Sequence, residues 1–131
     1  MTLLLDTHIF LAVQDQDSVK LTAEMRAAIS AALPNVFVST ASLWEIAIKF
    51  EKGKLKLFTA LENLPATCAQ LGLAILLIES KHVLCKLFTE PSTKDPFDRL
   101  LLAQAQVEDM QLMTIDLALK THPLAWKPKK S

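Results

Sequence analysis

Four acidic residues of this sequence stand close to points where a short apolar segment gives way to helix-forming sequence: Asp6, Glu45, Asp98 and Asp116. Carboxylate oxygens are the ligands that hard divalent cations such as Mg²⁺ and Mn²⁺ prefer. Carboxylates gathered in one place repel each other unless a cation neutralises them. A metal held in this way activates water and stabilises charge on a phosphate, so the four acids indicate hydrolysis of phosphodiester bonds.

Each of these acids also has a simpler explanation. Asp6 and Asp116 could cap helices, and Asp98 would be favoured by the helix dipole near a helix start. Glu45 could be a solvated capping-box residue, three positions after Ser42, that pairs with Lys49 one turn later. These local roles explain the acids one at a time, but not why all of them should fall at one end of one sheet.

Five further polar residues are candidates for supporting roles. Thr7, Ser39 and Thr114 could orient a carboxylate or a bound water. Asp95 is interpreted mainly as a helix N-cap, with a ligand role as the alternative. Arg99 could contact a phosphate or hold a neighbouring acid.

The segments between these residues alternate between apolar strands and amphipathic helices. Strands are predicted over residues 3–5, 36–38, 73–78 and 112–114, with an edge strand over 124–126. Helices are predicted over 7–13, 21–33, 39–50, 59–71, 80–88 and 96–108, and a short one opens at Asp116. Such alternation predicts an α/β fold with a parallel sheet covered on both faces, whose ligands bind at the carboxyl ends of the strands.

Length and composition narrow the class of protein. The 131 residues suit one domain, 1–131, and a hydrophobic fraction of 51% with two glycines excludes disordered and fibrous classes. Fourteen basic residues balance fourteen acidic ones, so net charge gives no support for nucleic-acid binding. The two cysteines follow no metal-binding spacing, and neither a secretory signal nor an apolar stretch of about 20 residues is visible. We therefore expect a cytoplasmic protein that does not enter a membrane.

Five segments resemble the PIN domains of bacterial VapC-type toxins, in the PilT N-terminus-like branch. They are LLLDTHIFLA (3–12), VSTASLWEIAIK (38–49), GKLKL (53–57), KDPFDRLLLAQA (94–105) and LMTIDLAL (112–119). The motifs D-T-H, S-x-W-E-I-A-I-K and D-P-F-D-R-L-L are specific in combination. The resemblance covers essentially the whole chain in the right order.

The resemblance implies a three-layer α/β/α sandwich and a Mg²⁺- or Mn²⁺-dependent endoribonuclease that acts on structured RNA. It also implies a homodimer, and a cognate antitoxin whose tail blocks the active site, as in type II toxin–antitoxin pairs. The four family acids fall on Asp6, Glu45, Asp98 and Asp116, and the threonine two residues before the last acid falls on Thr114.

The sequence departs from the family pattern in two places. Residues 91–94 stand where relatives often carry a basic or histidine-rich stretch, and residues 109–110 replace a common glycine. Asp6, Asp98 and Asp116 are expected to hold the cation, with Glu45 as a further ligand, as an anchor that holds the ligands in place, or as a base toward the metal-bound water. The alternative functions are a non-cleaving RNA- or protein-binding module and a metal-dependent DNase, because phosphate chemistry alone does not sense the 2′-hydroxyl.

Overall fold

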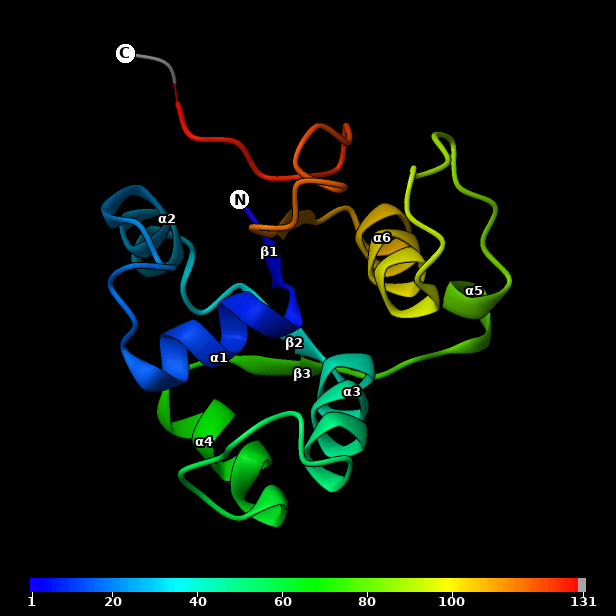
Figure 1. Ribbon diagram of the computed structural model, residues 1–131. Helices are drawn as coiled ribbons and strands as arrows, with labels where there is room; N and C mark the ends of the chain where they lie inside the picture. Colours follow the sequence, from blue (N-terminus) through cyan, green and yellow to red (C-terminus); the bar gives the residue numbers. More distant parts are fainter. Residues whose placement is uncertain (130–131) are drawn as a thin grey trace.

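Four short parallel strands form the centre of the computed structural model, which describes residues 1–129 (Figure 1). They are β1 (Leu3–Leu5), β2 (Val36–Ser39), β3 (Ala74–Leu76) and β4 (Gln111–Met113), arranged in the order β3-β2-β1-β4. Leu5 is aligned with Val38 on one side and with Met113 on the other. The carboxyl ends of these three strands therefore meet at one edge, where the polar residues that follow them gather.

The two faces of the sheet are covered by different helices, as the alternation of side chains along β1 requires. Leu3 and Leu5 pack in a cluster with residues of α1 (Thr7–Asp15), α2 (Ala23–Ala32) and α4 (Leu64–Gln70). Leu4 faces the other way and packs in a cluster with α6 (Pro96–Glu108), beside which α5 (Ser80–Val83) lies. The predicted parallel α/β/α arrangement is confirmed.

The helix α3 (Thr40–Glu51) begins directly after β2 and contacts both α1 and α6. Ser39 ends the strand and caps the helix, because its Oγ accepts a hydrogen bond of 3.0 Å from the N–H of Ala41. Gly53 follows the helix with a φ of 71°, the left-handed conformation that glycine adopts without strain. The boundaries predicted for this helix are correct to within one residue.

The start of α6 follows local rules closely. Asp95 caps it, with its Oδ1 accepting a hydrogen bond of 2.8 Å from the N–H of Phe97, and Pro96 takes the first helical position. The predicted burial is confirmed, because Leu101, Leu102 and the alanines that follow are almost completely enclosed. With 13 residues α6 is the longest helix within residues 1–129, where none has the length and hydropathy needed to cross a bilayer.

The helix predicted over 21–33 is three residues shorter in the structure, as Ala23–Ala32, and two other predicted helices are shortened much more. The segment 59–71 forms a 3₁₀ turn, η1 (Leu61–Asn63), before α4, so the predicted helix starts late. The helix predicted over 80–88 ends at Val83. Beyond it the side chain of Gln106 replaces helical bonding: its Oε1 accepts from the N–H of Phe88 at 2.9 Å, and its Nε2 donates to the carbonyl of Lys86 at 3.0 Å.

After β4, the sequence predicts a helix and a strand, but the structure has turns and a single bridge there. Asp116 opens a hydrogen-bonded turn and not a helix, because the chain is held at His122, whose ring bonds the Thr89 carbonyl at 2.8 Å. The predicted strand over 124–126 is a single parallel bridge between Ala125 and Leu112. The last two residues of the predicted domain 1–131 lie outside the described part of the chain.

Candidate active site

One small cleft at the carboxyl edge of the sheet contains all four of the singled-out acids. It lies where β1 and β4 end and has a volume of about 70 Å³, several times what one water needs. Its lining consists of Asp6, Thr7, His8, Glu45, Lys49, Asp95, Asp98, Leu101 and Asp116. Residues from four separate segments thus meet at one place.

Asp6 is both a helix cap and a wall of the cleft. Its backbone N–H continues the sheet by donating to the carbonyl of Met113 at 3.0 Å, and its Oδ1 accepts from the N–H of Ile9 at 2.8 Å. The residue is only 5% exposed. Burial raises the pKa of its carboxyl above the usual value, although hydrogen bonds from the Thr114 side chain and the Ile9 backbone act in the opposite direction.

Asp98 lies in the first turn of α6, and three other acids are close enough to influence its pKa. Burial, followed by the charges of Asp95 and Asp116, raises its pKa to about 6. The hydroxyl of Thr93 donates to its Oδ2 at 3.3 Å and lowers the pKa, while Glu45 raises it. The protein's own groups therefore do not compensate this carboxylate.

Glu45 projects from α3 toward the cleft with both oxygens already engaged. Thr7 Oγ1 donates to Oε1 at 2.6 Å, and Lys49 Nζ lies 2.8 Å from Oε2. The predicted pair with Lys49 is therefore present, but the side chain of Glu45 is only 13% exposed. The interpretation of Glu45 as a solvated capping-box residue is wrong, because Ser39 caps α3 and the first turn of α1 covers the Glu45 side chain.

Asp116 and Asp6 are connected through Thr114. The hydroxyl of Thr114 accepts from the N–H of Asp116 at 3.0 Å and hydrogen-bonds the Asp6 carboxylate. Asp116 Oδ1 in turn accepts from the N–H of Ala118 at 2.9 Å, which holds the turn after β4 in place. Thr114, only 3% exposed, thus orients the two acids that follow neighbouring strands.

Three of the supporting candidates, Ser39, Arg99 and Thr114, do not line the cleft, and only Thr114 of these contacts one of its acids. Ser39 is fully buried and serves as the N-cap of α3. The Nη2 atom of Arg99 lies 3.4 Å from Glu90 Oε1, so this arginine holds an acid that does not line the cleft. Thr7, Thr114 and Asp95 are the supporting candidates that the structure places beside the four acids.

Thr93 is a neighbour of the site that sequence reasoning missed. Besides donating to Asp98, its Oγ1 accepts from the N–H of Asp95 at 3.1 Å. A threonine two residues before a helix cap is a known turn-forming arrangement, so the T-K-D-P spacing carried a usable signal. The sequence contained no signal that the Thr93 hydroxyl would contact Asp98 and not solvent.

The donor set of the cleft fits a hard divalent cation. All of its acidic donors are carboxylate oxygens, and Lys49 is the only lysine or arginine in its lining. That ammonium is engaged with Glu45, while the pKa values of Asp6 and Asp98 are raised. A cation held by these acids would remove the repulsion that the fold imposes.

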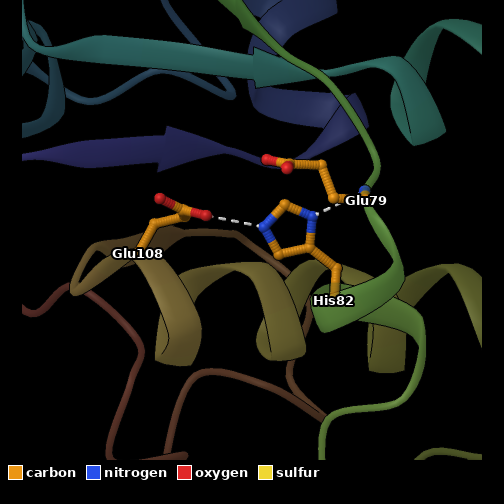
Figure 2. Close-up of side chains that lie close together, drawn as sticks. All are labelled: Glu79, His82 and Glu108. Carbon is orange, nitrogen blue, oxygen red and sulfur yellow. Dashed lines mark hydrogen bonds and ion pairs between the residues drawn. The ribbon is translucent and has the colours of Figure 1, made fainter.

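A second cluster, formed by Glu79, His82 and Glu108, brings three donor atoms within 4.8 Å of one another (Figure 2). His82 Nδ1 accepts from the backbone N–H of Glu79 at 2.9 Å, so the ring proton sits on Nε2, which donates to Glu108 Oε2 at 2.7 Å. Neither ring nitrogen of His82 has a free lone pair for a metal. This cluster fastens α5 to α6 and does not fit a cation.

The chain resembles known proteins in sequence family and in fold. The family model described as PIN domain matches residues 3–122, whereas a comparison with curated proteins matched none. A toxin–antitoxin complex from Klebsiella pneumoniae contains a similar chain, with a TM-score of 0.64 and 19% identity over 99% of this chain and 100% of that one. DNA-bound VapBC from Salmonella typhimurium gives 0.64 and 15% over 95% of both chains.

A third similar structure is VapBC2 from Rickettsia felis bound to a promoter DNA fragment. Its TM-score is 0.60 at 15% identity, over 95% of this chain and 96% of that chain. At such identities the three structures establish a shared fold, which agrees with the parallel sheet and its order.

Proposed function

The chain belongs to the PIN domain family, and from this premise we propose that it is a divalent-metal-dependent endoribonuclease, the toxin of a type II toxin–antitoxin pair in the cytoplasm. The family supports a nuclease, that is, a hydrolase of phosphodiester bonds. RNA as the substrate and Mg²⁺ or Mn²⁺ as the cofactor are parts of the proposal.

The observation that carries the proposal is the uncompensated charge of the cleft. Asp6, Asp98 and Asp116 come from three different segments, yet they line one cleft in which the pKa of Asp98 is raised to about 6. A fold gains no stability from such an arrangement by itself, since like charges and burial both oppose ionisation. The arrangement is suited to a protein that places a cation there, because the cation would neutralise the acids.

The residues of the cleft divide the work of hydrolysis among them. Asp6, Asp98 and Asp116 would hold the cation, which when bound supplies positive charge to phosphate oxygens and lowers the pKa of water. Thr114 hydrogen-bonds the Asp6 carboxylate and accepts from the backbone N–H of Asp116, which fixes the start of the turn that carries Asp116. Glu45 accepts the proton of the attacking water on a carboxylate oxygen, which is general-base catalysis at a positioned side chain.

The proposed partner is a cognate antitoxin, and the proposed assembly is a homodimer. Support for the antitoxin comes from the three similar structures, whose titles describe a toxin–antitoxin complex or VapBC. We propose that a second protein inhibits this chain by covering the cleft, as the resemblance to VapC-type toxins implies. The single PIN domain is proposed to span the whole of 1–131.

Cleavage of a mixed RNA pool by protein freed of any bound partner tests the proposal. With Mn²⁺ or Mg²⁺ we expect cleavage that EDTA stops and that Asp98→Asn lowers by about 10²–10³-fold, the loss expected when one preorganised charge is removed. Glu108→Gln, an acid-to-amide change outside the cleft, is the matched control and should cleave like the wild type.

Other outcomes would contradict parts of the proposal. Cleavage that persists in EDTA would exclude the metal mechanism. Cleavage of DNA but not RNA in a parallel reaction would make the chain a DNase. RNA binding without cleavage, across both metals and by protein shown to be folded, would indicate a binding module.

A further inference from the structure

Glu45 is the one acid of the cleft whose charge is compensated at short range by the protein itself. Lys49 Nζ lies 2.8 Å from Oε2, and Thr7 Oγ1 donates to Oε1 at 2.6 Å. Asp6 and Asp98 receive hydrogen bonds, but the structure shows no ion pair for either among residues 1–129. The four acids are therefore not equivalent.

The two groups that hold Glu45 come from different directions. Lys49 lies one turn further along the same helix, whereas Thr7 is the first residue of α1 and is 38 positions away in sequence. Thr7 is only 3% exposed, so its hydroxyl has no alternative partner in bulk water. A long and rotatable carboxylate is thus restrained at both oxygens.

The restraint on Glu45 bears on which of the four acids would hold the metal. A carboxylate accepts about four hydrogen bonds, and each oxygen of Glu45 keeps one lone-pair direction after binding Thr7 or Lys49. A charge already paired with an ammonium attracts a cation less strongly than an unpaired one. Such a group can fix an attacking water by accepting a hydrogen bond from it in the remaining lone-pair direction, and it is less suited to holding the metal than an unpaired carboxylate.

We propose that Thr7 and Lys49 are positioning residues that restrain Glu45 as a proton acceptor outside the set of direct metal ligands, which is then Asp6, Asp98 and Asp116. This inference rests on the proposed function, in which Glu45 is the base, and adds the residues that hold Glu45 in place for that role. Thr7 couples that role to the strand edge, because it directly follows the ligand Asp6 in the chain.

The test measures kcat and KM for RNA cleavage, and Mn²⁺ affinity by calorimetry, in four variants. Thr7→Val removes the hydroxyl at nearly constant shape and should lower kcat by about 10- to 100-fold, with KM and Mn²⁺ affinity unchanged. Thr7→Ser keeps the hydroxyl and should restore kcat. Glu45→Gln should lower kcat and leave Mn²⁺ affinity unchanged, whereas Asp98→Asn should weaken Mn²⁺ binding.

A double-mutant cycle separates positioning from a structural effect. If Thr7 acts through Glu45, Thr7→Val should cause no further loss of kcat in the Glu45→Gln background. Lys49→Met and Lys49→Arg repeat the comparison at a partly exposed position, where misfolding does not confuse the result. Loss in the methionine variant and recovery in the arginine variant are expected.

Three results would overturn the inference. Wild-type kcat in Thr7→Val, additive losses in the cycle, or a loss of Mn²⁺ affinity in Glu45→Gln equal to that in Asp98→Asn would each do so, and each would leave the nuclease assignment intact. A wild-type protein that neither binds Mn²⁺ nor cleaves RNA would overturn both the inference and the proposed function.

Discussion

The acidic cleft and the Glu79–His82–Glu108 cluster use similar residues for opposite purposes. In the cluster every charge meets a partner: His82 Nε2 is 2.7 Å from Glu108 Oε2, and Lys81 Nζ is 3.2 Å from the same oxygen. These contacts, with the hydrogen bond from His82 first, lower the pKa of Glu108 below its usual value. In the cleft, burial raises the pKa values of Asp6 and Asp98.

The difference shows how a cluster that holds two helices together can be distinguished from a binding site. By distance alone, the Glu79–His82–Glu108 cluster would be taken for a metal site, because its donor atoms lie close together. Both ring nitrogens of His82 and the Glu108 oxygen, however, already have hydrogen-bond partners. The cleft is distinguished by charge that the protein leaves uncompensated. We therefore use uncompensated charge, and not the closeness of potential ligands, as the guide to the proposed cation site.

The largest expected effect is on the free energy of unfolding, and it is expected in the Glu79–His82–Glu108 cluster. His82→Ala would remove a fully buried ring, leave the N–H of Glu79 without its partner and leave the Glu108 carboxylate only the exposed Lys81 ammonium at 3.2 Å. We expect a loss of about 3 kcal/mol in the free energy of unfolding, measured by urea denaturation. Mn²⁺ affinity should be unchanged, and a weakened affinity would show that the two regions are not independent.

The next effect concerns the cation. At a Mn²⁺ concentration of 100 times its dissociation constant, binding to the folded state alone adds about 2.7 kcal/mol of stability. We expect this gain in the wild type and in Glu108→Gln, and its loss in Asp98→Ala, from melting curves recorded with Mn²⁺ and with EDTA. A gain that is lost in Glu108→Gln but kept in Asp98→Ala would reverse the assignment of the two regions.

The pH dependence of the metal-free protein is a smaller effect with a defined sign. The folded pKa of Asp98, about 6, exceeds the ordinary value of 3.8, so the folded state binds more protons between these values. Stability should fall as pH rises from about 4 to about 6, by about 1–2 kcal/mol after discounting for solvent screening at this half-buried group.

Asp98→Asn is the variant that tests this slope, because it removes the titrating group at nearly constant volume. The variant should show a weaker decline in unfolding free energy over the same pH range. Asp6 contributes in the same direction, since its pKa is also raised. An unchanged slope in Asp98→Asn would mean that its carboxyl is not the uncompensated group.

The smallest effect is expected at Lys81, on the exposed side of the Glu79–His82–Glu108 cluster. Lys81→Gln removes an ion pair of 3.2 Å with Glu108, but the side chain of Lys81 is 55% exposed. Exposed pairs contribute at most about 1 kcal/mol, so the denaturation midpoint should change little compared with His82→Ala. A loss as large as that of His82→Ala would show that the ammonium, and not the buried ring, holds α5 to α6.

Much of the fold was predictable because it depends on interactions within a few residues. The apolar run 3–5 is expected to be buried because exposing it to water is unfavourable. Asp95 and Pro96 start a helix through their capping and backbone preferences, and Gly53 ends another. The helix predicted over 80–88 failed because Gln106, 18 positions beyond Phe88, supplies hydrogen bonds that compete with helical ones.

For the candidate site, the sequence by itself determined which acids follow strands and begin helices, and hence which edge of the sheet they occupy. Only the tertiary structure decided how they differ. The sheet order and the packing of α1 beside α3 bring Thr7 to Glu45, and burial sets the pKa of Asp98. Hydrogen-bond partners distant in sequence and the loss of solvent are properties of the folded chain, so no local pattern encodes them.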